Sequence, residues 1–152
     1  MNKIVLAKKG ICEFQKNRHP YLMLDYATEV VPGVSAKGYK QLKDKDEEWF
    51  FKVHWENDPN MPGMLQIESL VQMCALGILT IEGNKGKVVY LVNANDLKFY
   101  KKILPGDKLD NSTNILSFKR GIAKCYGEGK VNSQIVCKAS FTLVLTNDMI
   151  KI

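Results

Sequence analysis

Histidine, cysteine and proline are scarce in this chain of 152 residues, which has two, four and five of them. The cysteines, Cys12, Cys74, Cys125 and Cys137, form no Cys-x-x-Cys pair and lack the spacing typical of metal ligands. We therefore expect reduced thiols, at least two of them in the core, in a reducing compartment. We expect neither a metal nor another cofactor.

Long hydrophobic runs are also missing. No stretch reaches the length of a transmembrane helix, and the apolar run within residues 1–9 is too short for a signal peptide. The chain shows no internal repeat, low-complexity segment or linker. The simplest expectation is one cytoplasmic domain over residues 1–152, long enough to bury a real core.

Acidic residues are fewer than basic ones. The chain has 16 Asp and Glu against 22 Lys and Arg, which leaves a net charge of +6. This excess predicts an acidic partner without saying which kind. The lysines are scattered and no aromatic stacking set accompanies them, so nucleic acid is a weak candidate.

The most informative stretch is residues 53–68, Val-His-Trp-Glu-Asn-Asp-Pro-Asn-Met-Pro-Gly-Met-Leu-Gln-Ile-Glu. It holds His54, passes through a Met-Pro-Gly turn and enters the longest apolar segment of the chain. Glu68 lies a little over one turn inside that segment, where an unpaired carboxylate is costly unless it is partnered or neutral. Two groups able to move protons therefore flank a turn at the start of an expected helix.

That helix should run from about Pro62 to Ile81, because proline is well tolerated in a first helical turn and Gly-Asn follows the last apolar residue. It is apolar nearly all round, which indicates a buried helix. Its few polar positions are therefore informative. Glu68 and Gln72 are four residues apart and share one face, and Ser69 lies beside them.

Segments rich in β-branched and aromatic residues precede and follow this helix. A mixed-charge loop at residues 43–48 separates the first group from the helix, and turns are expected at residues 105–107, 119–121 and 132–133. The expected strands are residues 21–31, 35–42, 88–100, 108–118, 122–131 and 134–145. The pattern predicts an α+β fold in which an antiparallel sheet packs on one central helix.

Three motifs occur in order along the chain. Residues 17–25 read Asn-Arg-His-Pro-Tyr-Leu-Met-Leu-Asp, residues 61–68 read Met-Pro-Gly-Met-Leu-Gln-Ile-Glu, and residues 98–107 read Lys-Phe-Tyr-Lys-Lys-Ile-Leu-Pro-Gly-Asp. They resemble the H-R-Y-P-F-L-L-V-D, M-P-G-V-L-x-x-E and K/R-F-x-x-x-V-x-P-G-D motifs of the FabZ-type 3-hydroxyacyl-acyl-carrier-protein dehydratases. The resemblance covers about residues 14–145 and implies the hotdog fold, a sheet wrapped around one long helix. His54 lies fourteen residues before Glu68, as in that family.

One segment departs from the family pattern. The family usually reads G-H-F-P-G-x-P before its Met-Pro-Gly, whereas residues 53–59 here read Val-His-Trp-Glu-Asn-Asp-Pro. The histidine and the later proline are kept, while Glu56 and Asp58 are added beside the expected site.

The chemistry implied by this resemblance suits the residues present. Removing water from a 3-hydroxyacyl thioester needs a base for the C2 proton, and histidine side chains titrate near neutral pH, so His54 is the candidate. Backbone N–H groups at the helix start, where Gly63 permits close approach, suit the charge on the thioester oxygen. Burial favours the protonated form of Glu68, the candidate acid, and Gln72 is placed to hold it.

The resemblance also implies partners. His54 and Glu68 of one site would come from different subunits of a homodimer, and a trimer of dimers is a further possibility. The acyl-phosphopantetheine chain would come from acyl carrier protein, and no nucleic acid or membrane insertion is expected. The expected docking residues for this acidic carrier are Lys98, Lys101, Lys102, Lys119 and Arg120.

Other interpretations remain open from the sequence. A histidine before a turn is, taken alone, more often structural than catalytic, and Glu68 alone could pair with a lysine. A hotdog acyl thioesterase relies on a carboxylate and does not need this histidine. A non-catalytic protein that binds an acyl carrier or an acyl chain is favoured by the altered segment at residues 53–59.

Overall fold

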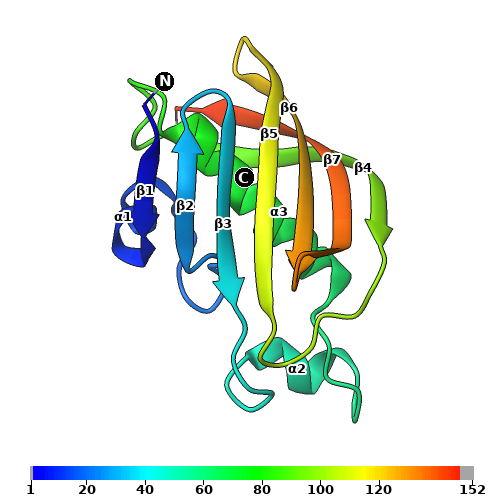
Figure 1. The fold of residues 1–152 in the computed structure, drawn as a ribbon. Helices are drawn as coiled ribbons and strands as arrows, with labels where there is room; N and C mark the ends of the chain where they lie inside the picture. The colour runs from blue at the N-terminus through cyan, green and yellow to red at the C-terminus, as the bar shows by residue number, and fades with distance from the viewer. Residues whose placement is uncertain (1, 148–152) are drawn as a thin grey trace.

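Seven antiparallel strands curl around one long helix (Figure 1) in a computed structural model that describes residues 2–147. The strand order is β1-β2-β3-β5-β6-β7-β4. The elements are β1 (Ile4–Ala7), α1 (Lys8–Phe14), β2 (Tyr26–Val31), β3 (Ser35–Gln41), α2 (Trp49–His54), α3 (Gly63–Leu79), β4 (Val88–Phe99), β5 (Lys108–Lys119), β6 (Ile122–Val131) and β7 (Gln134–Thr146). The predicted α+β class is confirmed.

The central helix α3 is the core of the molecule. It begins just after Pro62, whose φ of −54° suits a helix start. Every residue of α3 except Gly63, Met64 and Glu68 is buried, as the all-round apolar sequence predicts. Its observed end at Leu79 lies two residues before the predicted one.

The three long strands at the carboxyl side follow the predicted pattern closely. Two-residue turns at Arg120–Gly121 and Asn132–Ser133 connect them, and all four residues have positive φ values between 49° and 78°. Positive φ at both positions of a two-residue turn matches the right-handed twist of paired strands. These hairpins fix the register of β5, β6 and β7.

The prediction of one strand over residues 21–31 is wrong at its beginning, because β2 starts only at Tyr26. At Met23, three residues before it, the backbone is bound by side chains of α3 instead of a neighbouring strand. The Met23 N–H donates to Gln72 Oε1 at 2.8 Å, and the Met23 carbonyl accepts from Ser69 Oγ at 2.9 Å. Side chains far along the sequence therefore replace the ladder that a strand would need.

Two short elements were not predicted, the edge strand β1 and the helix α2. Helix α2 occupies the segment that leads into His54, and Phe50 and Phe51 fix it by burial, each 1% exposed. The thiol prediction is confirmed, since Cys74, Cys125 and Cys137 are buried and all four cysteines are free. Within residues 2–147, none of the helices has the length and hydropathy needed to cross a bilayer.

Strand β4 forms one edge of the sheet and carries apolar residues into solvent. Leu91 and Val92 are 40% and 58% exposed on this strand of twelve residues. A long apolar edge strand offers unpaired backbone groups to another chain.

Candidate active site

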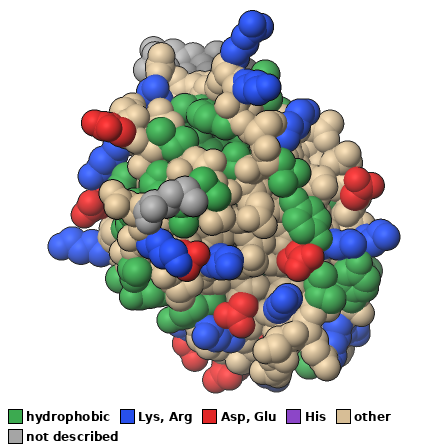
Figure 2. All heavy atoms as spheres, turned by 45° about the horizontal axis from the view of Figure 1, so that its top comes forward, with side chains coloured by type: hydrophobic (Ala, Val, Ile, Leu, Met, Phe, Trp, Pro, Cys, Tyr) green, Lys and Arg blue, Asp and Glu red, His purple; other side chains and the backbone are tan. Residues whose placement is uncertain are grey.

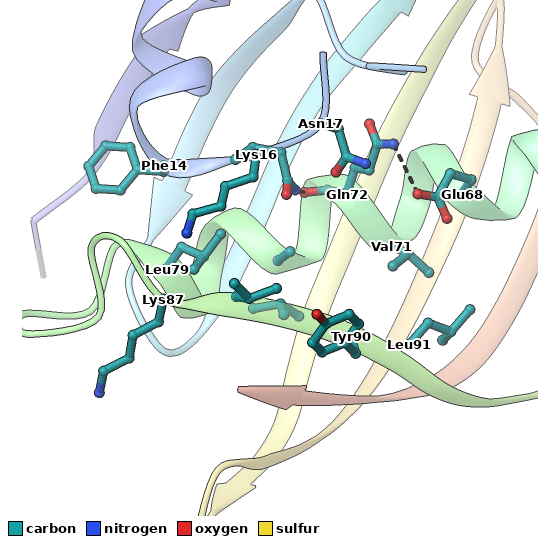
Figure 3. A pocket seen from close by; sticks show the side chains of 14 residues that line it. Phe14, Lys16, Asn17, Glu68, Val71, Gln72, Leu79, Lys87, Tyr90 and Leu91 are labelled. Carbon is teal, nitrogen blue, oxygen red and sulfur yellow. Dashed lines mark hydrogen bonds between the residues drawn. The ribbon is translucent and has the colours of Figure 1, made fainter. Parts of the chain in front are cut away.

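A pocket of about 380 Å³ runs along one side of α3 and has Glu68 in its lining (Figure 3). Three elements supply its walls: the polar and apolar face of α3, the first half of β4, and the segment that follows α1. The lining residues are Phe14, Gln15, Lys16, Asn17, Glu68, Val71, Gln72, Ala75, Leu79 and Lys87 to Leu91. A pocket with apolar walls and a few polar groups suits a flexible apolar ligand that carries a polar group.

Glu68 is the acidic group of this pocket. Burial raises the pKa of its carboxyl, and the hydrogen bond from Gln72 Nε2 to Glu68 Oε1, 3.0 Å long, opposes that rise only in part. Desolvation penalises the charged form of a carboxyl, while a donor favours it. The net direction is toward a carboxyl that keeps its proton to higher pH than an exposed glutamate.

Gln72 has every polar atom of its side chain engaged. Its Nε2 donates to Glu68 Oε1 and to the Tyr21 carbonyl, both at 3.0 Å, and its Oε1 accepts from the Met23 N–H. Because the backbone groups of Tyr21 and Met23 fix which end of the amide is oxygen, the nitrogen must point at Glu68. Gln72 is therefore placed as the sequence predicted, beside Glu68.

Ser69, the third polar residue of this group, points elsewhere. Its hydroxyl donates to the Met23 carbonyl and accepts from Asn111 Nδ2 at 2.6 Å. It is completely buried and is not among the residues that line the pocket. Its role in the structure is to join α3, β5 and the segment before β2.

His54 ends α2, and its ring is held by a backbone contact. Its Nδ1 lies 3.0 Å from the Asn60 carbonyl oxygen. A carbonyl can only accept, so this contact places a proton on Nδ1 and leaves Nε2 as the nitrogen with a free lone pair. His54 is not among the residues that line the Glu68 pocket, so one chain alone does not bring these two groups into one cavity.

The loop after His54 is tied to the segment that follows β4. Lys102 Nζ lies 2.7 Å from Asp58 Oδ2, and the Met61 N–H donates to the Ile103 carbonyl at 2.8 Å. The hydrogen bond from Lys102 lowers the pKa of Asp58. Asn60 Nδ2 donates to the Asp58 carbonyl at 2.9 Å. Asp58, which the sequence showed only as a departure, is thus one anchor of the loop that carries the Asn60 carbonyl.

Gly63 lies at the start of α3, in a second hollow of about 390 Å³ whose lining also includes Asn60, Phe99 and Tyr100. A Cβ at Gly63 would lie 2.9 Å from two atoms of the Phe99 ring. Any larger residue here would push that ring away from the start of α3. The first N–H groups of a helix have no partner within the helix, which leaves this end of α3 suited to an oxygen anion.

The five basic residues expected to dock a carrier do not form one patch on a single chain. Phe99 of β4 pairs with Cys137, which pairs with Gly129, which in turn pairs with Asn111 of β5. Lys119 lies eight residues after Asn111 on β5, which is about 26 Å at 3.3 Å per residue. Lys98, Lys101 and Lys102 therefore lie at one end of the sheet, and Lys119 and Arg120 at the other. Figure 2 likewise shows Lys and Arg side chains spread over one face among Asp and Glu.

Comparison with known proteins places this arrangement in a family. The FabA-like domain family matches residues 16–140. The chain is 35% identical over 141 residues to the 3-hydroxyacyl-[acyl-carrier-protein] dehydratase FabZ of Bacillus licheniformis, covering 93% of this chain and 96% of that one. It is 35% identical over 142 residues to the FabZ of Clostridium novyi, covering 92% and 99%.

A solved structure confirms the hotdog fold expected from the sequence. The dehydratase heterocomplex ApeI:P from Xenorhabdus doucetiae superposes with a TM-score of 0.75 over 91% of each chain at 15% identity. At that identity the likeness concerns the fold alone. With the FabA-like match over most of its length and relatives above 30% identity, the chain belongs to the FabA-like family.

Proposed function

We propose that this protein removes water from a 3-hydroxyacyl thioester on acyl carrier protein and gives the trans-2-enoyl thioester, in fatty-acid or related acyl-chain biosynthesis. The observation that carries the proposal is the Glu68 carboxyl, desolvated beside an apolar pocket and oriented by Gln72. The FabZ dehydratases to which the chain is similar support the same reaction.

The reaction assigns one role to each group. His54 Nε2 takes the proton from C2, and the electron pair of that C–H bond becomes the second bond between C2 and C3. The bond from C3 to its hydroxyl oxygen breaks, and Glu68 gives that oxygen the proton that makes it water. The N–H of Gly63 stabilises the charge on the thioester oxygen. Burial raises the pKa of Glu68, which favours the protonated form that this role requires.

The separation of His54 from the Glu68 pocket supports a site shared by two subunits. We propose a homodimer that pairs along β4, whose exposed edge carries Leu91 and whose first residues line the pocket. A two-fold axis across such an edge reverses the strand direction. It would bring Lys119 and Arg120 of one subunit to the end of the sheet where the second subunit has its Lys98, Lys101 and Lys102. A trimer of dimers would show in sedimentation as three times the dimer mass.

The same reversal bears on carrier docking. Lys98 and Lys101 are exposed, whereas Lys102 is engaged with Asp58. We propose that Lys98 and Lys101, with Lys102 contributing less, meet the acidic carrier together with Lys119 and Arg120 of the second subunit. Exposed charges of this kind mainly raise the association rate and weaken at high salt.

Mixing two inactive variants tests the reaction and the shared site together. His54→Ala removes the base and Glu68→Ala removes the acid, and each should lower turnover roughly 10²–10⁴-fold. In a mixed dimer one site carries both substitutions and the other carries neither. Random exchange makes about half of the dimers mixed, so activity should return to roughly a quarter of wild type.

The controls separate the remaining interpretations. Exchange of subunits is confirmed with two differently tagged chains, and no recovery after confirmed exchange rejects the shared site. Wild-type activity in either single variant rejects the catalytic assignment. The assay follows enoyl formation and thiol release in parallel, because a thioesterase releases thiol from saturated acyl thioesters and a binding protein does neither.

A further inference from the structure

We propose that the end of the pocket remote from Glu68 binds an anionic group at the far end of the acyl chain, most simply a terminal carboxylate. This inference rests on the proposed function, because it concerns the substrate of the same site. The residues that carry it are Lys16, in the segment after α1, and Lys87, just before β4. Both line the pocket together with Glu68.

The pocket has different chemistry at its two ends (Figure 3). Glu68 lies at one end, and Phe14, Lys16, Leu79 and Lys87 lie at the other. From Glu68 to Leu79 the helix advances eleven residues, or roughly 16 Å at 1.5 Å per residue. The walls between the two ends are mostly apolar, formed by side chains such as Val71, Ala75, Val88 and Val89, with Gln15 and Tyr90 also in the lining. A chain that reached the lysines would therefore cross apolar surface and end among positive charges.

Among residues 2–147, no carboxylate forms an ion pair with either of these two ammonium groups. In the part of the chain that the structure describes, Lys87 Nζ has only the neutral Asn84 Oδ1 at 3.4 Å. Their neighbour Lys85 differs, because its Nζ lies 3.4 Å from Glu13 Oε2 and 5.0 Å from the centre of the Phe14 ring. Lys85 is also absent from the pocket lining.

An apolar pocket closed by apolar side chains favours a methyl end, because burying a carboxylate without a partner is costly. Two ammonium groups that pair with no carboxylate among residues 2–147 offset that cost and attract the carboxylate. The acyl chain and the carrier arm leave the thioester in opposite directions. With the thioester at Glu68 and the acyl chain in the pocket, the phosphate of the arm lies away from the lysines.

The experiment compares matched substrates in matched variants. The substrates are 3-hydroxyacyl thioesters of equal length, ended by methyl or by carboxylate, each carried on acyl carrier protein and on N-acetylcysteamine, which has no phosphate. The proteins are wild type, the double variant Lys16→Gln, Lys87→Gln, and the control Lys85→Gln. The readout is the ratio of kcat/KM for the carboxylate-ended substrate to that for the methyl-ended one.

Each exposed charge pair changes an affinity or a kcat/KM by between about 1.5-fold and about 5-fold. The double variant should therefore lower the ratio by about 2-fold to about 25-fold on both carriers, with a smaller loss at high salt. Lys85→Gln should leave the ratio unchanged. A ratio that does not move in the double variant overturns the inference. The inference is also overturned if kcat/KM falls equally for the methyl-ended and carboxylate-ended substrates on carrier protein but not on N-acetylcysteamine. That result would mean that the lysines bind the phosphate of the carrier arm.

Failure of the proposed function gives a different result. If wild type dehydrates neither substrate, the reaction is wrong, and the inference is then decided by affinity. Unreactive amide analogues ended by methyl or carboxylate, titrated calorimetrically into the same three proteins, should show the same change of ratio. Equal affinity ratios in wild type and the double variant would overturn it.

Discussion

Replacing Gln72 with leucine tests whether one amide secures the Glu68 end of the pocket. The Met23 N–H, on a residue that is 1% exposed, would lose its acceptor, and the partly buried Tyr21 carbonyl would lose its donor. An unpaired buried polar group costs about 1–3 kcal/mol, and a partly exposed one lies at the lower end of that range. The free energy of unfolding should therefore fall by about 2–4 kcal/mol.

Gln66 supplies a matched control on the same helix. It is 4% exposed, but its side chain makes one hydrogen bond, from Nε2 to the Met61 carbonyl at 3.0 Å. Its Oε1 has no donor among the described residues. Leucine there removes the unpaired Oε1 but leaves the carbonyl of Met61, which is 1% exposed, without its donor. One buried unpaired group replaces another, so the free energy of unfolding should change by less than about 1 kcal/mol.

Urea denaturation at one fixed protein concentration measures both variants, because association with a second subunit would otherwise shift the midpoint. For a chain of this size about 1 kcal/mol corresponds to about 2–4 °C, so the melting temperature of Gln72→Leu should fall by about 4–16 °C. If Gln72→Leu is no more destabilising than Gln66→Leu, the amide does not secure the Tyr21–Met23 segment and the reasoning is wrong.

Three further predictions concern the pocket and its loop. Burial raises the pKa of Glu68 above its ordinary value of 4.5, so this group lowers the stability of wild type as pH rises beyond that value. The melting temperature of Glu68→Gln, measured relative to wild type, should therefore rise between pH 4.5 and neutrality. A difference that stays the same at every pH would contradict this. Ala75→Phe, at a buried lining position, should lower kcat/KM for long acyl chains at least tenfold while short chains are spared, and an equal loss at all lengths would argue against the pocket. Asp58→Lys should lower kcat/KM up to about fivefold, and adding Lys102→Asp should restore it if the pair positions the loop.

The parts of the fold that the sequence predicted are those where local pattern and tertiary environment agree. Helix α3 is apolar all round and buried all round, and its predicted and observed limits differ by two residues at most. The hairpins around Gly121 and Ser133 combine alternating strands with turn residues. Only the beginning of the strand predicted over residues 21–31 was wrong, because side chains of α3, rather than a strand, bind the backbone of Met23.

The same division holds for the candidate site. The spacing of four between Glu68 and Gln72 predicted a contact that the structure confirms at 3.0 Å. The pairing of Lys102 with Asp58 joins residues 44 positions apart, and no local pattern predicts it. On a single chain the five docking residues are divided between two ends of the sheet, because the pairing of β4 with β7, which no local pattern predicts, sets Lys119 far from Lys101.

The burial of α3 on all sides restricts how proteins of this architecture can acquire new substrates. A residue of α3 that faces the pocket also packs in the core, so a large-to-small change there costs about 2–5 kcal/mol along with any gain in space. The opposite wall, formed by the segment after α1 and the start of β4, is half-exposed or exposed around Lys16 and Lys87. Substitutions at such positions usually change stability by less than about 0.5 kcal/mol. Selection for new acyl chains therefore has most freedom at this outer rim, while the helix stays nearly fixed.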